Sequence, residues 1–405
     1  MTDVQAPTFD PSSPEFLKDR YGTYRRLRDT APLHETSNAP PTVLLTRHAD
    51  VARALREPSV RMLPPGAGAP PWLGDGAAAE MFRGQMLFTD PPDHTRLRKV
   101  VTPAFRPKTV ARLRDAIDRA LDERIDLLRE KNAFDAVTDL AEFVPAIAVC
   151  TILGIPDDDW PALIRGAVDF VLVLSPLELS TEQVQRADSI CEYYLNYFEE
   201  LVAERRRHPG GDDDFVTVLI RAQDEGDKLS NTELLATAHS VLNAGFETTM
   251  SALANGLQGM LGDQDQWSAL CADPDLAPAA VEETLRWEAP AQILTRFAAE
   301  ALVLDSGEVP AGTSMVIGAA AGNRDERRFS NPDQFDLHRP DVAHLSFGAG
   351  RHACIGAHLG RMELEMAFRK LAAAFPEMEL VGTEAPREPN PMFPTLQRLD
   401  VVAQP

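Results

Sequence analysis

The chain has 405 residues, 44% of them hydrophobic and 25% charged, so it carries enough apolar side chains for a substantial core. Acidic residues outnumber basic ones by 62 to 40, which argues against nucleic acid or an anionic membrane surface as a partner. The N-terminus has no signal-sequence pattern and no apolar window is long enough to cross a membrane, so we expect a cytoplasmic protein with no membrane association.

The pattern of apolar residues predicts a mainly α fold with a minor β portion. No linker, repeat or low-complexity tract divides the chain, so we expect a single domain over residues 1–405 with a flexible N-terminal segment at 1–12. The segment RMLPPGAGAPPWLGDGAAA, which begins at Arg61, is too rich in proline and glycine for regular structure and is predicted to be a lid. Helices are predicted at 14–30, 47–56, 92–105, 109–130, 138–153, 181–207, 231–261, 278–288 and 355–374, and strands at 42–46, 294–304, 314–319 and 398–403.

Two pairs of charged residues have helical spacing. His94 and Arg98 are four residues apart, hence on one helix face, and could hold a carboxylate, although a solvated basic face explains the spacing better by itself. Glu283 and Arg286, in the segment EETLR, are three apart, and taken alone they predict an ordinary surface ion pair of little energetic value.

The helix predicted at 231–261 would be about 45 Å long at 1.5 Å per residue, and its middle reads AGFETT. Ala244 and Gly245 leave a bare patch where a ligand or dioxygen could lie against the backbone. The hydroxyl of Thr248 can bond to the carbonyl of Ala244 and open the helix locally, with the carboxylate of Glu247 beside the opening. A bent helix with an incidental surface glutamate would also explain this segment.

Cys354 lies in the stretch HLSFGAGRHACIGAHLG, residues 344–360, at the start of a predicted amphipathic helix. Unpaired N–H groups and the helix dipole favour a thiolate there. Gly348, Gly350 and Gly356 remove side chains beside Phe347, so a planar cofactor could approach the backbone closely. A porphyrin is a planar cofactor that fits such a loop. An axial thiolate on haem iron also favours O–O cleavage. The other cysteines, Cys150, Cys191 and Cys271, are predicted to be small buried apolar residues, with neither a disulfide framework nor a structural zinc site.

The segment FGAGRHACIG, residues 347–356, resembles the cysteine-ligand loop of the cytochromes P450, the haem-thiolate monooxygenases, in its bacterial form. Six further segments in the family's order extend the resemblance from about residue 90 to residue 360: DPPDHTRLRKVV, AGFETT, EETLR, ILTRFA, GNRDERRF and NPDQFDLHRP. One departure is Glu326, which follows the NRD triplet where proline is common and leaves the local turn in question. The resemblance implies the cytochrome P450 fold, haem b as cofactor and Cys354 as the axial ligand of the iron.

Further roles follow from the resemblance alone, residue by residue. It implies that Glu247 and Thr248 are the oxygen-activating acid and threonine. It also implies a structural group that fastens the loop under the haem, namely Glu283, Arg286 and Arg339. The haem-binding residues implied are His94, Arg98, Arg296 and His352 at the propionates, together with Ala244, Phe347, Gly348 and Gly356.

The activity implied by the resemblance is insertion of one oxygen atom from O₂ into an organic small molecule, by hydroxylation or epoxidation. Electrons would come from NAD(P)H through ferredoxin reductase and ferredoxin, because the chain has no flavin or dinucleotide fingerprint of its own. Two alternatives are an H₂O₂-driven peroxygenase, which typically replaces the acid and threonine, and a non-catalytic haem-binding sensor, which would not need AGFETT. From Arg96 to Arg114 the chain carries seven basic residues and no acidic one, so we expect an acidic ferredoxin to dock near Arg96, Lys99, Lys108 and Arg112.

The substrate pocket is expected to be apolar, with the lid and the run DFVLVLSPL at 169–177 contributing to its walls. Asn243 and Arg83 are the two polar candidates near it. A terpenoid, steroid, fatty acid, aromatic compound or macrolide would fit this description. The residues expected to face the pocket are Phe88, Leu172, Asn243, Ile293, Leu294 and Phe393.

Overall fold

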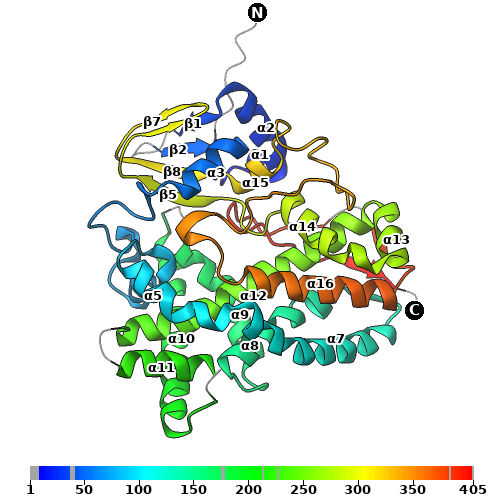
Figure 1. The fold of residues 1–405 in the computed structure, drawn as a ribbon, viewed down its shortest axis with the longest axis horizontal. Helices are drawn as coiled ribbons and strands as arrows, with labels where there is room; N and C mark the ends of the chain where they lie inside the picture. The colour runs from blue at the N-terminus through cyan, green and yellow to red at the C-terminus, as the bar shows by residue number, and fades with distance from the viewer. Residues whose placement is uncertain are drawn as a thin grey trace, which may run out of the picture.

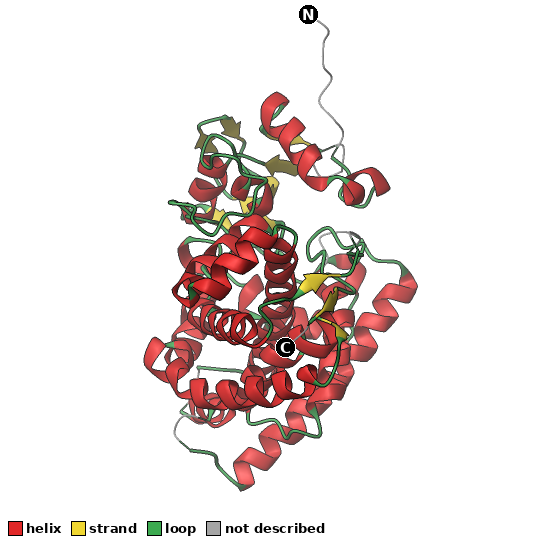
Figure 2. Cartoon of the chain, turned by 90° about the vertical axis from the view of Figure 1, so that its right-hand side faces the viewer, coloured by secondary structure: helices red, strands yellow, loops and turns green. Residues whose placement is uncertain are grey.

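The computed structural model describes residues 9–36, 42–174, 178–211, 214–225, 228–382 and 385–403. Most of this chain is helical, and the strands form small groups, as predicted (Figures 1 and 2). The helices are α1 Pro14–Lys18, α2 Arg20–Thr30, α3 His48–Arg56, α4 Ala77–Gly84, α5 Asp93–Val101, α6 Pro107–Val110, α7 Arg114–Arg129, α8 Phe143–Leu153, α9 Trp160–Phe170, α10 Thr181–Arg207, α11 Phe215–Asp224, α12 Asn231–Leu261, α13 Gln264–Ala272, α14 Ala277–Trp287, α15 Ala319–Asn323 and α16 Ala357–Ala374. The strands are β1 Leu33–Glu35, β2 Thr42–Leu45, β3 Val60–Arg61, β4 Ala133–Asp135, β5 Leu294–Ala298, β6 Leu302–Leu304, β7 Gly307–Val309, β8 Thr313–Ile317, β9 Glu379–Leu380 and β10 Asp400–Val402.

The larger sheet has the strand order β1-β2-β8-β5-β3 and lies at one end of the molecule with α1, α2, α3 and α15 (Figure 1). Strands β2 and β8 are parallel, and the other neighbours in this sheet are antiparallel. The register pairs Arg296 of β5 with Met315 of β8, whose side chain is buried in the core of this sheet. Alternation along β5 then places Leu294 and Arg296 on the same face, and both line the cavity described below.

Helix α12 runs through the middle of the helical part and is buried on most of its length (Figure 1). Its start is a capping box, in which the Glu233 N–H donates to Ser230 Oγ at 3.2 Å and the Ser230 N–H donates to Glu233 Oε2 at 2.8 Å. Burial of so much apolar surface, rather than helix propensity, holds a helix of this length in place. Because α8, α4 and α14 pack around it, α12 forms a rigid wall for any site beside it.

Several predicted elements have different limits in the structure. The predicted helices 92–105 and 109–130 are interrupted by 3₁₀ turns at Thr102–Phe105 and Ala111–Leu113. In the first of these turns Pro103 has no N–H to continue the α ladder. The predicted strand 294–304 is two strands, β5 and β6, separated by a turn. Helices α9, α11 and α13 were not predicted, although the Asp214 side chain accepts a bond from the Thr217 N–H at 2.7 Å and caps α11.

The segment expected to be an irregular lid was wrongly predicted for its last residues, because residues 77–79 are the first three residues of α4. Its N-terminus has no cap of its own; instead Asp188 of α10 accepts a hydrogen bond from the Ala78 N–H at 2.9 Å. The predicted flexible segment 1–12 lies outside the described residues for 1–8. Phe9, by contrast, is buried against the rings of Phe16 and Tyr24. The run 169–177 is described only as far as Leu174.

Candidate active site

In the AGFETT segment α12 is a continuous helix, so the local opening expected there is not seen. Thr248 Oγ1 donates to the carbonyl oxygen of Ala244 at 2.7 Å, the bond expected from the spacing. A side chain at Gly245 would come within 2.4 Å of Val149 in α8, so the close approach of α8 requires glycine there. Glu247 is only 7% exposed, which contradicts the explanation of an incidental surface glutamate. Burial raises its pKa to about 8, with a smaller contribution from the negative charge of Glu388, so Glu247 can exchange a proton near neutral pH.

The cysteine loop is held by its own backbone. The N–H of Cys354 donates to the carbonyl of Phe347 at 2.8 Å, and Gly348 between them has a φ of 62°, which favours glycine. Gly350 also has a positive φ, and a side chain there would come within 2.4 Å of the carbonyl oxygen of Leu55 in α3. The close approach of α3 therefore requires glycine at this position, whereas the sequence alone predicted glycine there to make room for a cofactor.

Cys354 precedes α16, whose first residue is Ala357, and its sulfur opens on an internal cavity. Burial of the surrounding loop raises the pKa of the Cys354 thiol, whereas the Gly356 N–H and the guanidinium groups of Arg98 and Arg361 act in the opposite direction. The N–H group at the helix start therefore favours the thiolate, as expected, but burial outweighs its effect on the pKa. A metal ion bound at sulfur would displace the proton and complete the charge balance.

Four basic side chains line the same cavity next to the loop: His94, Arg98, Arg296 and His352. The rings of His94 and His352 lie 4.1 Å apart, and Arg98 Nη2 donates to the carbonyl of Ala353 at 2.7 Å. Both ring nitrogens of His94 and Nε2 of His352 are buried without a hydrogen-bond partner among the described residues. Burial, reinforced by the neighbouring cations, lowers the pKa of His352 to about 3, and burial lowers that of Arg296 to about 10. The unpartnered histidine nitrogens beside two arginines indicate that the cluster would accept a ligand that carries negative charge.

The cavity has a volume of about 340 Å³ and joins all three features. Its lining includes Cys354, Ala244 and Thr248 of α12, and the four basic residues. A flat ligand with a metal ion and two carboxylates would fit this set of groups, because the cysteine could bind the metal and the four basic side chains could bind the carboxylates. Haem b has both properties, so the residues present fit it.

Glu283, Arg286 and Arg339 form a buried network rather than a surface pair. Nε and Nη2 of Arg286 each donate to the Glu283 carboxylate at 2.7 Å, and Arg339 Nε donates to the same carboxylate at 3.1 Å. Arg286 also donates to the carbonyls of Asn323, Pro332 and Gln334, which belong to the segment leading into the cysteine loop. The network therefore ties α14 to this segment.

A family model described as Cytochrome P450 matches residues 39–397. The chain is a cytochrome P450. Members of this family bind haem b through a cysteine thiolate and act as monooxygenases that use O₂, small-molecule substrates and redox partners. The predicted family, fold and cofactor are thereby confirmed.

Similar P450 proteins share about a third of their residues with this chain. Cytochrome P450 107B1 of Saccharopolyspora erythraea is 34% identical, with 95% of this chain and 94% of the relative covered. Cytochrome P450 monooxygenase PikC of Streptomyces venezuelae is 35% identical, with 96% and 92% covered. The crystal structure of CalO2 superposes with a TM-score of 0.89 at 32% identity, over 98% of this chain and 99% of that one.

Three of the six residues expected to face the substrate pocket of this P450 line the cavity, namely Asn243, Leu294 and Phe393. The other three do not. Phe88 stacks on the ring of Phe82 with centroids 3.8 Å apart, Ile293 is buried in a separate apolar cluster, and Leu172 packs against the main core. Arg83 is paired with Asp75 at the surface.

Other cavity residues were missed by the sequence analysis. Thr237 and Val241 precede Ala244 and Thr248 at spacings of four, three and four residues, so the helical period of α12 could have identified them. Gln85 also lines the cavity, but it follows α4, and no local pattern marks it.

In the NRD segment, where Glu326 replaces the common proline, the turn still forms, because the Arg328 N–H donates to the Asp325 carbonyl at 2.9 Å. Glu326 itself accepts a bond from Arg28 at 2.6 Å.

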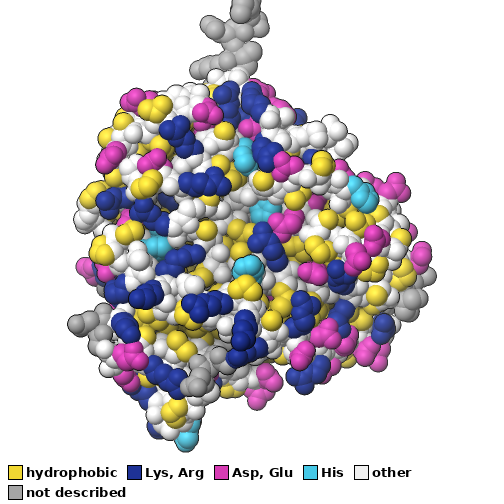
Figure 3. All heavy atoms as spheres, in the orientation of Figure 1, with side chains coloured by type: hydrophobic (Ala, Val, Ile, Leu, Met, Phe, Trp, Pro, Cys, Tyr) yellow, Lys and Arg dark blue, Asp and Glu magenta, His cyan; other side chains and the backbone are white. Residues whose placement is uncertain are grey.

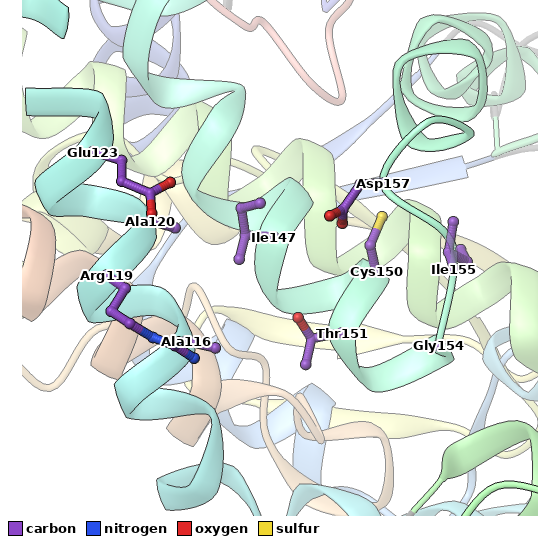
Figure 4. Close-up of a pocket in the computed structure, with 10 residues that line it drawn as sticks. All are labelled: Ala116, Arg119, Ala120, Glu123, Ile147, Cys150, Thr151, Gly154, Ile155 and Asp157. Carbon is purple, nitrogen blue, oxygen red and sulfur yellow. The ribbon is translucent and has the colours of Figure 1, made fainter.

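A second, shallower hollow of about 280 Å³ lies between α7 and α8, and Cys150 and Asp157 line it (Figure 4). Burial raises the pKa of the Cys150 thiol to about 12, and the nearby carboxylate of Asp157 adds to the effect. The thiol is therefore neutral and unreactive, as predicted for a structural cysteine.

None of the helices in the described part of the P450 chain combines the length and apolarity that crossing a bilayer requires.

Proposed function

We propose that this P450 holds haem b through Cys354 and inserts one oxygen atom from O₂ into an apolar small molecule. Electrons would reach it from NAD(P)H through ferredoxin reductase and ferredoxin. The observation that carries the proposal is the single cavity lined by Cys354, the four basic residues and the AGFETT segment of α12. When bound, haem supplies the iron at which O₂ is activated and from which the oxygen atom is transferred.

The chain's own residues would hold the cofactor and move protons. His94, Arg98, Arg296 and His352 would bind the two propionates, which neutralises the basic cluster. Ala244, Phe347, Gly348 and Gly356 would leave room for the ring, since their side chains are absent, small or flat at the cavity wall. Glu247, with its pKa of about 8, would pass protons from solvent to the part of the cavity beside Thr248.

Oxygen uptake separates this proposal from the two alternatives. Substrate-dependent consumption of O₂ and NADPH with surrogate ferredoxin and reductase, yielding an oxygenated product, is the expected result. Product formation that requires only H₂O₂ would indicate a peroxygenase. Haem binding with no product under either condition would indicate a sensor, and both of these outcomes contradict the proposal.

Replacing Thr248 by alanine is expected to leave substrate binding and reduction intact while product per NADPH falls by roughly tenfold or more, with the lost electrons appearing as H₂O₂. The reason is that the Thr248 hydroxyl would position the groups that deliver protons into the cavity and would not hold substrate. Measuring product, NADPH and peroxide together checks this. The matched control is Ser189→Ala, which removes the same kind of bond, from Ser189 Oγ to the Gln185 carbonyl, on an exposed part of α10. Unchanged coupling in Thr248→Ala would exclude Thr248 from the proton path.

The ferredoxin is proposed to dock on the basic segment that runs from the end of α5 to the start of α7. Lys99, Lys108 and Arg112 are exposed, and neighbouring Arg98 reaches the carbonyl of the residue before Cys354. Lys and Arg side chains gather over the centre and lower left of this face, whereas Asp and Glu gather toward its right-hand edge (Figure 3). Arg96 does not belong to the docking set, because it is bonded to Glu233 and Asp93 and closes onto the start of α12.

Reversing the charge of Lys99 or Lys108 to glutamate is expected to slow the first electron transfer by about tenfold at low salt and to flatten its dependence on ionic strength. Substrate affinity should not change, because neither side chain lines the cavity. Stopped-flow reduction by an acidic ferredoxin measures the rate. Lys18→Glu on α1, an equal charge change at the far end of the molecule, serves as the control (Figure 1). A rate insensitive both to salt and to the two reversals would place the docking site elsewhere.

A further inference from the structure

Two polar side chains where α4 meets α12 line the cavity wall and have no role in holding haem or moving protons. Gln85 and Thr237 are 3% and 4% exposed. Gln85 Nε2 and Thr237 Oγ1 have no hydrogen-bond partner among the described residues, although both residues line the cavity. A buried polar group without a partner is costly, so such a pair points to a ligand that satisfies it.

The two side chains come from elements that are packed together. Gly84, the residue before Gln85, lies so close to α12 that a side chain there would meet the Thr232 carbonyl at 2.8 Å and the Ala236 side chain at 2.7 Å. Thr237 follows Ala236 directly. Thr232 Oγ1 also donates to Glu80 at 3.0 Å, which holds α4 on α12. Gln85 and Thr237 therefore lie at one end of the cavity in a prearranged position.

The other polar side chains that line the cavity on this part of α12 are already engaged. Ser240 Oγ donates to the Ala236 carbonyl at 2.7 Å, and Asn243 Nδ2 donates to the Ala167 carbonyl at 3.3 Å. Thr237 lies seven residues before Ala244, which corresponds to about 10 Å along the helix axis. The unengaged pair is thus well separated from the position where oxygen would be transferred.

No further cation lines the cavity among the described residues. The cations of the cavity wall are the four residues assigned to the propionates, and Arg83 is tied to Asp75 at the surface. A carboxylate placed beside Gln85 and Thr237 would be buried without a counter-charge, which is strongly unfavourable. A neutral oxygen could accept a hydrogen bond from either group, and a hydroxyl could also donate one to the amide oxygen.

We infer that Gln85 and Thr237 form a subsite for a neutral oxygen of the substrate, about 10 Å from the carbon that is oxidised. The substrate class is an extended or large apolar molecule with a hydroxyl, carbonyl or ester oxygen at its far end, and not a free carboxylic acid. This inference rests on the proposed function, because the oxidised carbon is located by the haem.

Imidazoles with an N-alkyl tail test the subsite, because the ring nitrogen binds haem iron and sends the tail into the cavity. Tails of roughly six to ten carbons span the distance to the pair and would end in methyl, hydroxyl or carboxylate. The shift of the Soret band on titration of the loaded protein gives each dissociation constant. At the best tail length, the hydroxyl probe should bind about fivefold to tenfold more tightly than the methyl probe, and the carboxylate probe should bind most weakly.

Two near-isosteric variants identify the groups responsible. Gln85→Leu and Thr237→Val should each reduce or abolish the preference for hydroxyl over methyl, while the methyl probe binds as well or better. Ser240→Ala is the comparison, since its hydroxyl is already bonded, and it should keep the preference. No preference for hydroxyl at any length, a preference for carboxylate, or a preference unchanged in both variants would overturn the inference. The proposed function is tested separately, because the methyl probe still reports a haem with an accessible iron.

Discussion

Replacing Cys354 by serine is expected to abolish the red-shifted Soret band that the reduced, CO-bound protein should show. The shift arises from thiolate ligation, and a serine oxygen cannot reproduce it. Because the sulfur opens on the cavity and is not packed in the core, the free energy of unfolding of the haem-free chain should change by less than about 1 kcal/mol. The CO difference spectrum and thermal unfolding of the same preparation measure the two quantities.

Cys271→Ser is the control for this experiment, because Cys271 lies in α13 and does not line the cavity. The control protein should keep the shifted band. A shifted band that survives in Cys354→Ser, or a native protein whose fresh spectrum is that of histidine-ligated haem, would remove Cys354 from the iron.

Glu283→Ala should yield very little haem-loaded protein. The carboxylate of Glu283 is almost fully buried between Arg286 and Arg339, so its loss leaves two buried cations without their partner, at a cost of about 3–5 kcal/mol. That is a large share of the net stability of a typical domain. The same loss frees the segment that leads into the cysteine loop, because Arg286 holds its carbonyls.

The ratio of haem to protein after purification, together with the unfolding midpoint, measures this effect. Asp126→Ala is a matched control, because Asp126 pairs with Arg129 at the same spacing of three residues but on the surface of α7. The control should change stability by less than about 1 kcal/mol. Normal haem content in Glu283→Ala would show that the network does not support the loop.

The family, the mainly α fold and the central helix could be read from the sequence, because each depends on local patterns. The segment around Cys354, the helical period of 231–261 and the Ser230 capping box are all set by residues close together in the chain. The Thr248 bond to Ala244 follows from the same local geometry, since residues four apart in a helix always meet.

The tertiary structure determined the properties that depend on packing between elements far apart in the sequence. Glu247 was open to a surface explanation until the packing around α12 was seen to bury it and raise its pKa. Arg96 looked like a docking residue, but the start of α12 places Glu233 against it. The helix α4 in a segment rich in proline and glycine is capped by Asp188 of α10, far away in the sequence. Gln85 follows that helix, and only its packing on α12 brings the amide into the cavity beside Thr237, because long-range contacts leave no periodic trace in the sequence.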